Sequence, residues 1–215
     1  HASLEGFPRR LDQRTVPLFV PDLPRRDVRG APGGGDVPHT VTYDDLIASA
    51  NPVLPDEGEE TDPVVLMYTG GTTGVSKGAV LLHRNLVANL LQSEAWYQPA
   101  LAKIPAGEQI MTVCALPLYH IFGFTANMML GLRMGSCNLL IPNPRDLPAV
   151  LKELSRHTFH SLPAVNTLFN ALVNHPDFDT VDWSNLKVSL GGGTAVQEAV
   201  SRLWQQKTGC TICEG

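Results

Sequence analysis

Eleven residues between two short apolar runs carry most of the chain's candidate chemistry. Residues 68–78 read Tyr-Thr-Gly-Gly-Thr-Thr-Gly-Val-Ser-Lys-Gly and hold four glycines, three threonines, one serine and one lysine. Glycines let a backbone turn tightly and bring its N–H groups close to an anion. The hydroxyl groups donate hydrogen bonds, and the lysine adds a positive charge. This density of donors predicts a phosphate-binding loop, whose candidate ligands are Thr69, Gly70, Gly71, Thr72, Thr73, Gly74, Ser76 and Lys77.

The spacing in this loop excludes a Walker A motif. That motif needs a glycine, four residues and then Gly-Lys-Ser/Thr, followed by a helix. Here Lys77 precedes Gly78, and the apolar residues 79–82 follow. Residues 64–67 and 79–82 are typical of short buried strands, so the loop is predicted to join two strands. An ordinary hairpin loop is the alternative, because clusters of Gly, Thr and Ser often form one.

Two other motifs also follow predicted strands. Residues 116–123 read Leu-Pro-Leu-Tyr-His-Ile-Phe-Gly and place His120 among aromatic residues, which suits the mouth of an apolar pocket. A purely structural histidine is the alternative. Residues 191–193 are three glycines between a strand and a helix. They predict a tight turn with close packing, and their bare backbone could also lie against a flat ring and a phosphate.

Strands and helices alternate after residue 63. Strands are predicted at 110–115, 137–141, 159–162, 187–190 and 211–213, and helices at 83–101, 121–133, from 147, 165–174 and 194–208. Asp146 is predicted to cap one helix, Thr194 and Gln197 to form a capping box, and Gly209 to end the last helix. This alternation predicts an α/β fold, a mostly parallel sheet with helices packed on its faces. Ligands of such sheets bind at the carboxyl ends of the strands.

The remaining residues define two parts of the chain. Residues 1–62 predict an irregular N-terminal segment and an acidic linker, with a short helix from Thr42, and residues 63–215 predict a partial nucleotide- and acyl-binding domain. The 215 residues are 43% hydrophobic and 17% charged, with a net charge of −5, which argues against a nucleic-acid surface. No apolar run is long enough to span a membrane, and residues 1–5 show no signal peptide.

The four cysteines predict a reducing, cytoplasmic compartment. Cys114 and Cys137 lie in apolar runs and are predicted to be core thiols. Cys210 and Cys213 form one Cys-x-x-Cys pair. A zinc site would need a second pair or suitably spaced histidines, so neither a metal nor a redox role is expected there.

Residues 68–78 resemble the phosphate loop of the adenylate-forming enzymes, which include acyl-CoA synthetases, luciferases and peptide-synthetase adenylation domains. The resemblance implies that the loop holds the β- and γ-phosphates of ATP while a carboxylate attacks the α-phosphorus. It gives catalytic roles to Lys77, Thr73 and His120, and Mg²⁺ binding to Thr69 and Glu214. The implied acyl pocket is Tyr119, His120, Phe122 and Gly123, and the implied nucleotide contacts include Gly191, Gly192, Gly193, Glu214 and Gly215.

A finer resemblance is to bacterial long-chain fatty-acid–CoA ligases. Residues 117–122, 143–146, 166–172 and 191–197 carry it, and Leu82 departs from it where many relatives have threonine. It implies ATP, Mg²⁺, CoA and a fatty acid as cofactors and substrates, and allows peripheral contact of the parent with the inner membrane. Glu214 and Gly215 resemble the start of the motif Glu-Gly-Tyr-Gly-x-Thr-Glu, so the rest of that motif and the C-terminal lid domain are expected to be absent.

The chain alone is therefore expected to be inactive. An aryl-CoA ligase and a peptide-synthetase adenylation domain stay open as alternatives, as does a nucleotide-binding module without catalysis. The sequence leaves the oligomeric state open.

Overall fold

A six-stranded sheet forms the centre of this computed structural model, which describes residues 18–19, 58–69 and 77–215. All of its registered strand pairs are parallel, in the order β1-β5-β4-β6-β7-β8. The α/β fold with a parallel sheet is confirmed. The strands are β1 (Leu18–Phe19), β4 (Met111–Cys114), β5 (Cys137–Leu140), β6 (Ser161–Ala164), β7 (Val188–Gly191) and β8 (Ile212–Glu214). The predicted short helix from Thr42 and loop residues 70–76 lie outside the described residues.

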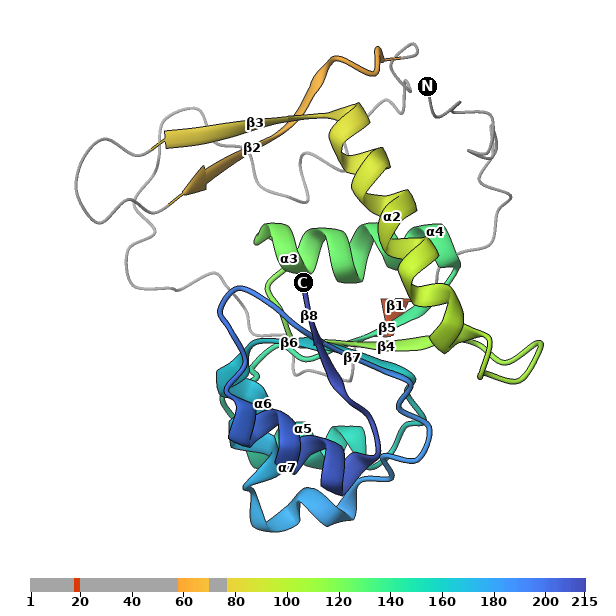
Figure 1. The fold of residues 1–215 in the computed structure, drawn as a ribbon, viewed down its shortest axis with the longest axis vertical. Coiled ribbons are helices and arrows are strands. Elements are labelled where there is room, and N and C mark those ends of the chain that lie inside the picture. Colours follow the sequence, from red (N-terminus) through yellow and green to blue (C-terminus); the bar gives the residue numbers. More distant parts are fainter. Residues whose placement is uncertain (1–17, 20–57, 70–76) are drawn as a thin grey trace, which may run out of the picture.

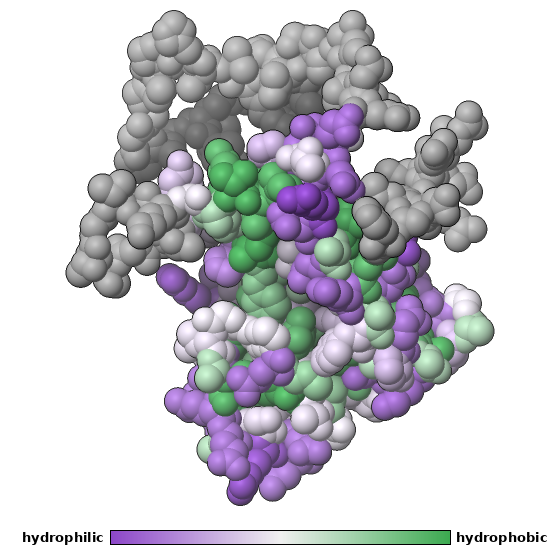
Figure 2. All heavy atoms as spheres, turned by 45° about the horizontal axis from the view of Figure 1, so that its top comes forward, coloured by the Kyte–Doolittle hydropathy of each residue, from purple (hydrophilic) through white to green (hydrophobic). Residues whose placement is uncertain are grey.

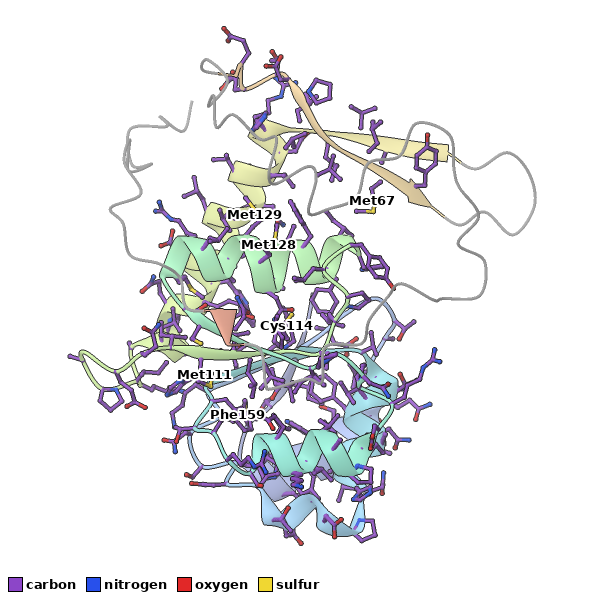
Figure 3. All side chains as sticks on the ribbon, turned by 180° about the vertical axis from the view of Figure 1, so that it is seen from behind. Met67, Met111, Cys114, Met128, Met129 and Phe159 are labelled. Carbon is purple, nitrogen blue, oxygen red and sulfur yellow. The ribbon has the colours of Figure 1, made fainter. Side chains whose placement is uncertain are left out.

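Helices cover both faces of the sheet (Figure 1). One face carries α2 (His83–Leu101) and a continuous helical stretch made of α3 (Ile121–Gly123), η2 (Phe124–Met129) and α4 (Leu130–Met134). The other face carries α5 (Leu147–Leu154), α6 (Asn166–Val173), η3 (Pro176–Thr180) and α7 (Glu198–Thr208). Figure 3 shows Cys114 on the first side of the sheet and Phe159 on the second. The two predicted core thiols, Cys114 and Cys137, are both buried.

The larger core lies between the sheet and helices α5–α7. Its aromatic centre is Trp204, which is fully buried and contacts Phe169 and Trp183 edge-on at ring distances of 4.9 and 5.1 Å. The Trp204 indole N–H donates to Ser189 Oγ at 2.9 Å, so the buried nitrogen has a partner. A smaller cluster, which includes Leu90, Tyr97, Leu130 and Val188, packs α2 and α4 on the opposite face.

Helix α2 has the predicted bounds, but two other predicted boundaries are wrong. Strand β6 begins at Ser161, and not at Phe159 as predicted. Ser161 is the first residue in register with both β4 and β7. Helix α7 begins at Glu198 with Gln197 as its N-cap, so the predicted capping box does not form. The Gln197 N–H instead donates to Asn166 Oδ1 at 3.0 Å.

The other two predicted helix signals are confirmed. Asp146 caps α5, and its Oδ1 accepts from the Ala149 N–H at 3.2 Å. Gly209 ends α7 in the left-handed region, with φ of 74°.

Strands β2 (Pro63–Thr69) and β3 (Lys77–Leu82) form an antiparallel hairpin that stands apart from the sheet (Figure 1). The prediction that both are buried strands is wrong for the described residues. Leu66 is 61% exposed and Val80 is 53% exposed. A two-stranded ribbon that belongs to no larger sheet has no layer to cover its faces. Figure 2 shows apolar side chains gathered in a band on this upper part of the molecule.

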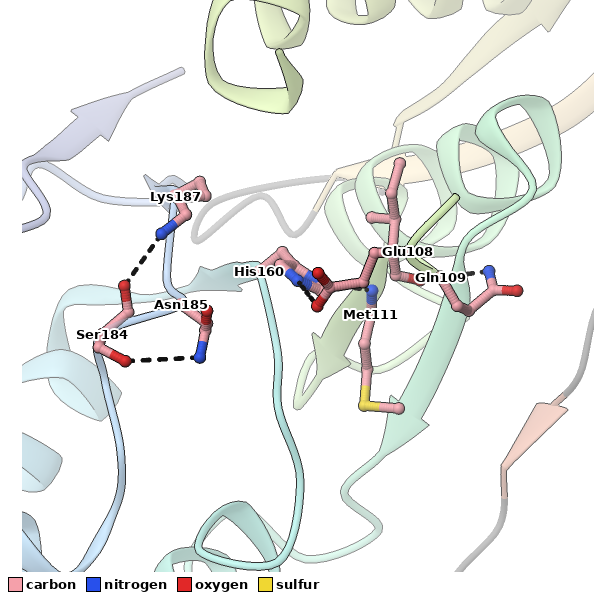
Figure 4. A network of polar contacts seen from close by, with 8 residues as sticks. Glu108, Gln109, Met111, His160, Ser184, Asn185 and Lys187 are labelled. Atoms are coloured by element: carbon pink, nitrogen blue, oxygen red, sulfur yellow. Dashed lines mark hydrogen bonds and ion pairs between the residues drawn. The ribbon is translucent and has the colours of Figure 1, made fainter. Parts of the chain in front are cut away.

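A buried histidine ties the amino ends of two strands together (Figure 4). His160 is 3% exposed, and its Nδ1 accepts from the Met111 N–H at 3.1 Å. Its Nε2 lies 3.1 Å from Glu108 Oε1. Because Nδ1 accepts, Nε2 carries the proton and donates to the carboxylate. This contact fixes the turn before β4, at the edge of the sheet opposite the carboxyl ends of the strands.

Candidate functional site

A cleft of about 310 Å³ lies on the α2 side of the sheet, near the carboxyl ends of β7 and β8. We name it the α2–η2 cleft, because α2 and the stretch from α3 to α4 supply most of its walls. Its volume is at the lower end of the ~300–1,000 Å³ range of ligand pockets. His120, Phe122, Gly192, Gly193 and Gly215 all line it. Residues that are far apart in the sequence therefore meet here, at the edge where parallel sheets bind ligands.

Helix α2 forms one wall of the cleft with residues spaced four apart. Asn89, Ser93 and Tyr97 line the cleft and share one helical face. Tyr97 is 2% exposed, and its hydroxyl lies near the Ser161 hydroxyl without reaching full hydrogen-bond geometry. Burial raises the pKa of Tyr97 to about 12. The Ser161 hydroxyl, in β6, is also buried without a hydrogen bond of full geometry among the described residues. Tyr97 therefore contributes a neutral aromatic ring to the wall of the cleft.

His120 caps the helix on the opposite wall and is exposed to solvent. Its Nδ1 accepts from the Phe122 N–H at 3.2 Å. A neutral ring held in this way carries its proton on Nε2, which can donate to a ligand oxygen. Phe122 follows on the first turn and lines the cleft beside His120. The pair thus combines an apolar surface with one hydrogen-bond donor.

The three glycines at the end of β7 and just after it have three different environments. A Cβ on Gly191 would lie 2.5 Å from Val196 Cγ2, and one on Gly192 would lie 2.8 Å from Phe122 Cε1. Gly193 has φ of 80°, a conformation that side chains disfavour. The predicted tight turn with close packing is present, and Gly192 and Gly193 also line the cleft.

Glu214 and Gly215 lie beside this glycine turn. The Gly215 N–H donates to the Gly191 carbonyl at 3.0 Å, and Glu214 Oε2 accepts from the Val196 N–H at 3.2 Å. Glu214 is exposed, so its carboxylate can meet a ligand from solvent. The described residues contain no group of three His, Cys, Asp or Glu side chains that could hold a metal by themselves.

Two predicted pocket residues lie elsewhere. Tyr119 is 89% exposed and lines a separate cavity of about 580 Å³ between the segments that follow β4 and β5. Gly123 is buried, and a Cβ there would lie 2.4 Å from the Pro117 carbonyl oxygen. Its described role is therefore to let the turn before α3 close tightly. A third cavity, of about 440 Å³, separates the segment after β4 from Val165.

The predicted phosphate loop begins and ends at one strand pair. Thr69 of β2 is in register with Lys77 of β3, so the two ends of the loop are neighbours. Residues 70–76, which include Thr72, Thr73 and Ser76, lie outside the described residues. The structure therefore shows the base of the loop and not the loop itself.

Comparison with known proteins places the chain in a family. The profile of the AMP-binding enzyme family matches residues 13–215. The chain belongs to the AMP-binding enzyme family. It is 51% identical over 155 residues to the long-chain-fatty-acid–CoA ligase of Yersinia pestis, which covers 72% of this chain and 27% of that protein. It is 43% identical over 185 residues to the ligase of the same name from Haemophilus influenzae. That match covers 83% of this chain and 32% of the Haemophilus protein.

Solved structures agree with this assignment. ATP-bound MatB from Rhodopseudomonas palustris is 26% identical, with a TM-score of 0.65 over 80% of this chain and 32% of that one. The anthranilate CoA ligase AuaEII, solved with anthranoyl-AMP, is 24% identical and has a TM-score of 0.67. The match covers 85% of this chain and 35% of AuaEII, and it supports the shared fold. The chain thus spans roughly a quarter to a third of the length of these relatives.

Sequence reasoning missed several cleft residues of this AMP-binding enzyme. The sequence predicts only that residues 89, 93 and 97 belong to a long helix, although the spacing of four between Asn89, Ser93 and Tyr97 places them on one face. Thr125 and Leu130 also line the cleft. Their spacing of five gives no signal in a search for α-helical faces.

Proposed function

We propose that this chain is the central part of a long-chain fatty-acid–CoA ligase, the part that binds the phosphates of ATP and the acyl group. The observation that carries the proposal is the α2–η2 cleft. It joins the His120–Phe122 turn to the glycine turn and Gly215 in one place. Identity of 51% to a protein named for this activity supports the choice of substrate.

The proposed reaction has two steps. A fatty carboxylate attacks the α-phosphorus of ATP, which forms an acyl-adenylate and releases pyrophosphate. The thiol of CoA then attacks the acyl carbonyl and releases AMP. In the first step negative charge moves onto the leaving pyrophosphate oxygens, so catalysis depends on positioning and on fixed donors.

The loop between β2 and β3 would supply these donors. Its backbone N–H groups, the hydroxyls of Thr72 and Thr73, and the charge of Lys77 would stabilise the β- and γ-phosphates. The registered pair of Thr69 and Lys77 supports this role, because it brings both ends of the loop together on one hairpin. A donor fixed before the reaction costs no reorganisation when the charge develops.

The turns around the cleft would hold the reacting groups. The Gly191–Gly193 turn would take the adenine ring and the α-phosphate against bare backbone. His120 would donate from Nε2 to the substrate carboxylate, while the side of Phe122 guides the acyl chain into the cleft. Tyr119 would act from the neighbouring cavity that it lines, and Gly123 would act in the turn that supports His120.

Glu214 and Thr69 fit a magnesium site by their chemistry. Mg²⁺ prefers carboxylate and hydroxyl oxygens. Glu214 binds the Val196 N–H through Oε2, and the described residues give Oε1 no hydrogen-bond partner. The ion would neutralise charge on the ATP phosphates, and Glu214 would hold it beside the glycine turn.

The experiment is a substrate panel on the full-length protein. We expect acyl-AMP and acyl-CoA from palmitate, ATP, Mg²⁺ and CoA, with lower kcat/KM for benzoate and amino acids. Preference for an aromatic acid would favour an aryl-CoA ligase, and preference for an amino acid would favour a peptide-synthetase domain. ATP binding without turnover of any acid would favour a non-catalytic module.

The cellular setting is part of the same proposal. Among the described helices, none has both the length and the apolar character needed to cross a membrane. We place the full-length protein in the cytoplasm, with a peripheral contact at the inner membrane where fatty acids enter. Fractionation of cells into membrane and supernatant, with and without added fatty acid, tests this placement.

A further inference from the structure

The helix that follows His120 has a wide turn in its middle. Residues Phe124–Met129 form a π-helix, η2, between the short α-helices α3 and α4. The Leu130 N–H donates to the Thr125 carbonyl five residues earlier, which is the hydrogen bond that defines such a turn. π turns are rare and are found frequently at functional sites. This one lies against the α2–η2 cleft.

The wide turn decides which side chain lies below Thr125 on the cleft wall. Thr125, Ala126 and Leu130 all line the cleft, so Leu130 lies below Ala126, four residues earlier, and also below Thr125, five residues earlier. In an α-helix, residues five apart are separated by about 140° around the axis, whereas residues four apart share a face. An α-helical register would therefore bring Met129, not Leu130, below Thr125. Figure 3 shows Met128 and Met129 on this helix, above the sheet.

Two buried asparagines fasten the wide turn to the sheet. Asn127 Nδ2 donates to the Val113 carbonyl of β4 at 3.1 Å. Asn138 Nδ2, from β5, donates to the Asn127 carbonyl at 3.2 Å. Their exposed fractions are 1% and 5%. The Asn127 carbonyl also accepts from the Leu130 N–H, so Asn138 binds the helix where its hydrogen-bond ladder changes.

The helix packs closely against Asn138 at this contact. A Cβ on Gly131 would lie 2.7 Å from Asn138 Nδ2 and 3.1 Å from Ser136 Oγ. The side-chain carbonyl oxygens of both asparagines are buried without a hydrogen-bond partner among the described residues. Such unpaired groups reduce stability. The two asparagines therefore contribute little to the stability of the fold. A role in positioning η2 accounts for them better.

We propose that Asn127 and Asn138 are positioning residues that hold η2 in its π register and so set the acyl-chain preference of the cleft. The inference rests on the proposed function, because it takes the cleft as the acyl site. It assigns the pair no contact with substrate. Its effect passes through the choice between Leu130 and Met129 on the cleft wall.

The test uses the full-length protein with Asn138→Leu, which removes the donor and keeps a similar volume. We expect η2 to relax toward an α-helix and the longer Met129 side chain to enter the cleft. The ratio of kcat/KM for palmitate to that for octanoate should fall by roughly 10-fold or more, while KM for ATP is unchanged. Adding Met129→Ala to this variant should restore the ratio.

A matched control is Ser189→Ala, which removes a buried donor and acceptor on the opposite face of the sheet. Ser189 is fully buried and binds Trp204. This variant should lose stability and keep the wild-type ratio. If Asn138→Leu loses activity equally with both acids, the pair is structural and the proposal is overturned.

A crystal structure of Asn138→Leu gives a readout that does not depend on activity. Met129 on the cleft wall supports the proposal. Leu130 still on that wall, with its N–H bound to the Thr125 carbonyl, overturns it. A wild-type protein that activates no fatty acid would overturn the proposed function and the acyl preference, and the crystal structure would still decide whether the pair holds the register.

Discussion

At the scale of single residues, the glycine turn shows how one motif divides into separate tasks. Gly191 lies in β7 and leaves room for the packing of Val196 and Ile212. Gly192 leaves room for the Phe122 ring in the cleft. Gly193 allows a left-handed backbone. The first glycine thus serves the core, the second serves the cleft, and the third serves the turn.

Alanine substitutions should separate the first two tasks. Gly191→Ala overpacks the core and should lower the free energy of unfolding by about 1–3 kcal/mol. Gly192→Ala presses on the Phe122 ring, which can move into the cleft, so KM for the fatty acid should rise with a smaller loss of stability. Urea denaturation and steady-state kinetics on both variants measure this. Equal losses of stability with an unchanged KM for the acid would contradict the assignment.

At the scale of elements, the sequence predicted those with a periodic pattern or a strong cap. Helix α2 has the predicted bounds, and Asp146 caps α5 as expected. The π turn could not be predicted, because an apolar helix with one wide turn has the same composition as one without. The start of α7 was missed because Thr194 offers a capping side chain, whereas the chain is held three residues later by Asn166.

Tyr97 couples α2 to the sheet and should leave a signature at high pH. Burial raises its pKa from 10.0 to about 12. Between these values the unfolded chain releases a proton that the folded protein keeps, so stability falls as pH rises, by about 2–3 kcal/mol in total. Tyr97→Phe should show a flatter loss between pH 10 and 12 in urea denaturation.

The same variant tests the buried hydroxyl. Because the Tyr97 hydroxyl has only a contact of poor geometry with the Ser161 hydroxyl, its removal should change stability at pH 7 by less than about 1 kcal/mol. Tyr119→Phe, which alters an exposed ring, is the control. A slope at high pH that is the same in Tyr97→Phe and wild type would show that Tyr97 titrates normally.

At the scale of the whole molecule, the chain corresponds to one part of its longer relatives. It spans 27% of the length of its Yersinia pestis relative, and it contains the α2–η2 cleft together with the base of the proposed phosphate loop. The candidate site was predictable where residues follow strands, as with His120 and Gly192. The contribution of α2 to the site was not predictable, because its polar face lines the cleft only when the helix lies against the sheet.

The chain by itself should form no acyl-CoA and should self-associate. Leu66 and Val80 of the hairpin are more than half exposed, which leaves apolar surface open to other copies. A sizing column should show species larger than the 23.3 kDa chain. Leu66→Lys with Val80→Lys should shift it toward the monomer. Palmitoyl-CoA formed by the chain alone at the rate of a full ligase would contradict this view.

The central claim is that the β2–β3 loop stabilises the pyrophosphate of ATP while a fatty carboxylate reacts. The most direct measurement is palmitate-dependent exchange of pyrophosphate into ATP by the full-length protein. Lys77→Ala and Thr73→Ala should each slow this exchange by roughly 10- to 1000-fold, as lost transition-state donors do. Lys187→Ala, which removes a lysine bound to the Ser184 carbonyl at the far end of the sheet, should leave it unchanged. Exchange at the wild-type rate in both loop variants would contradict the account.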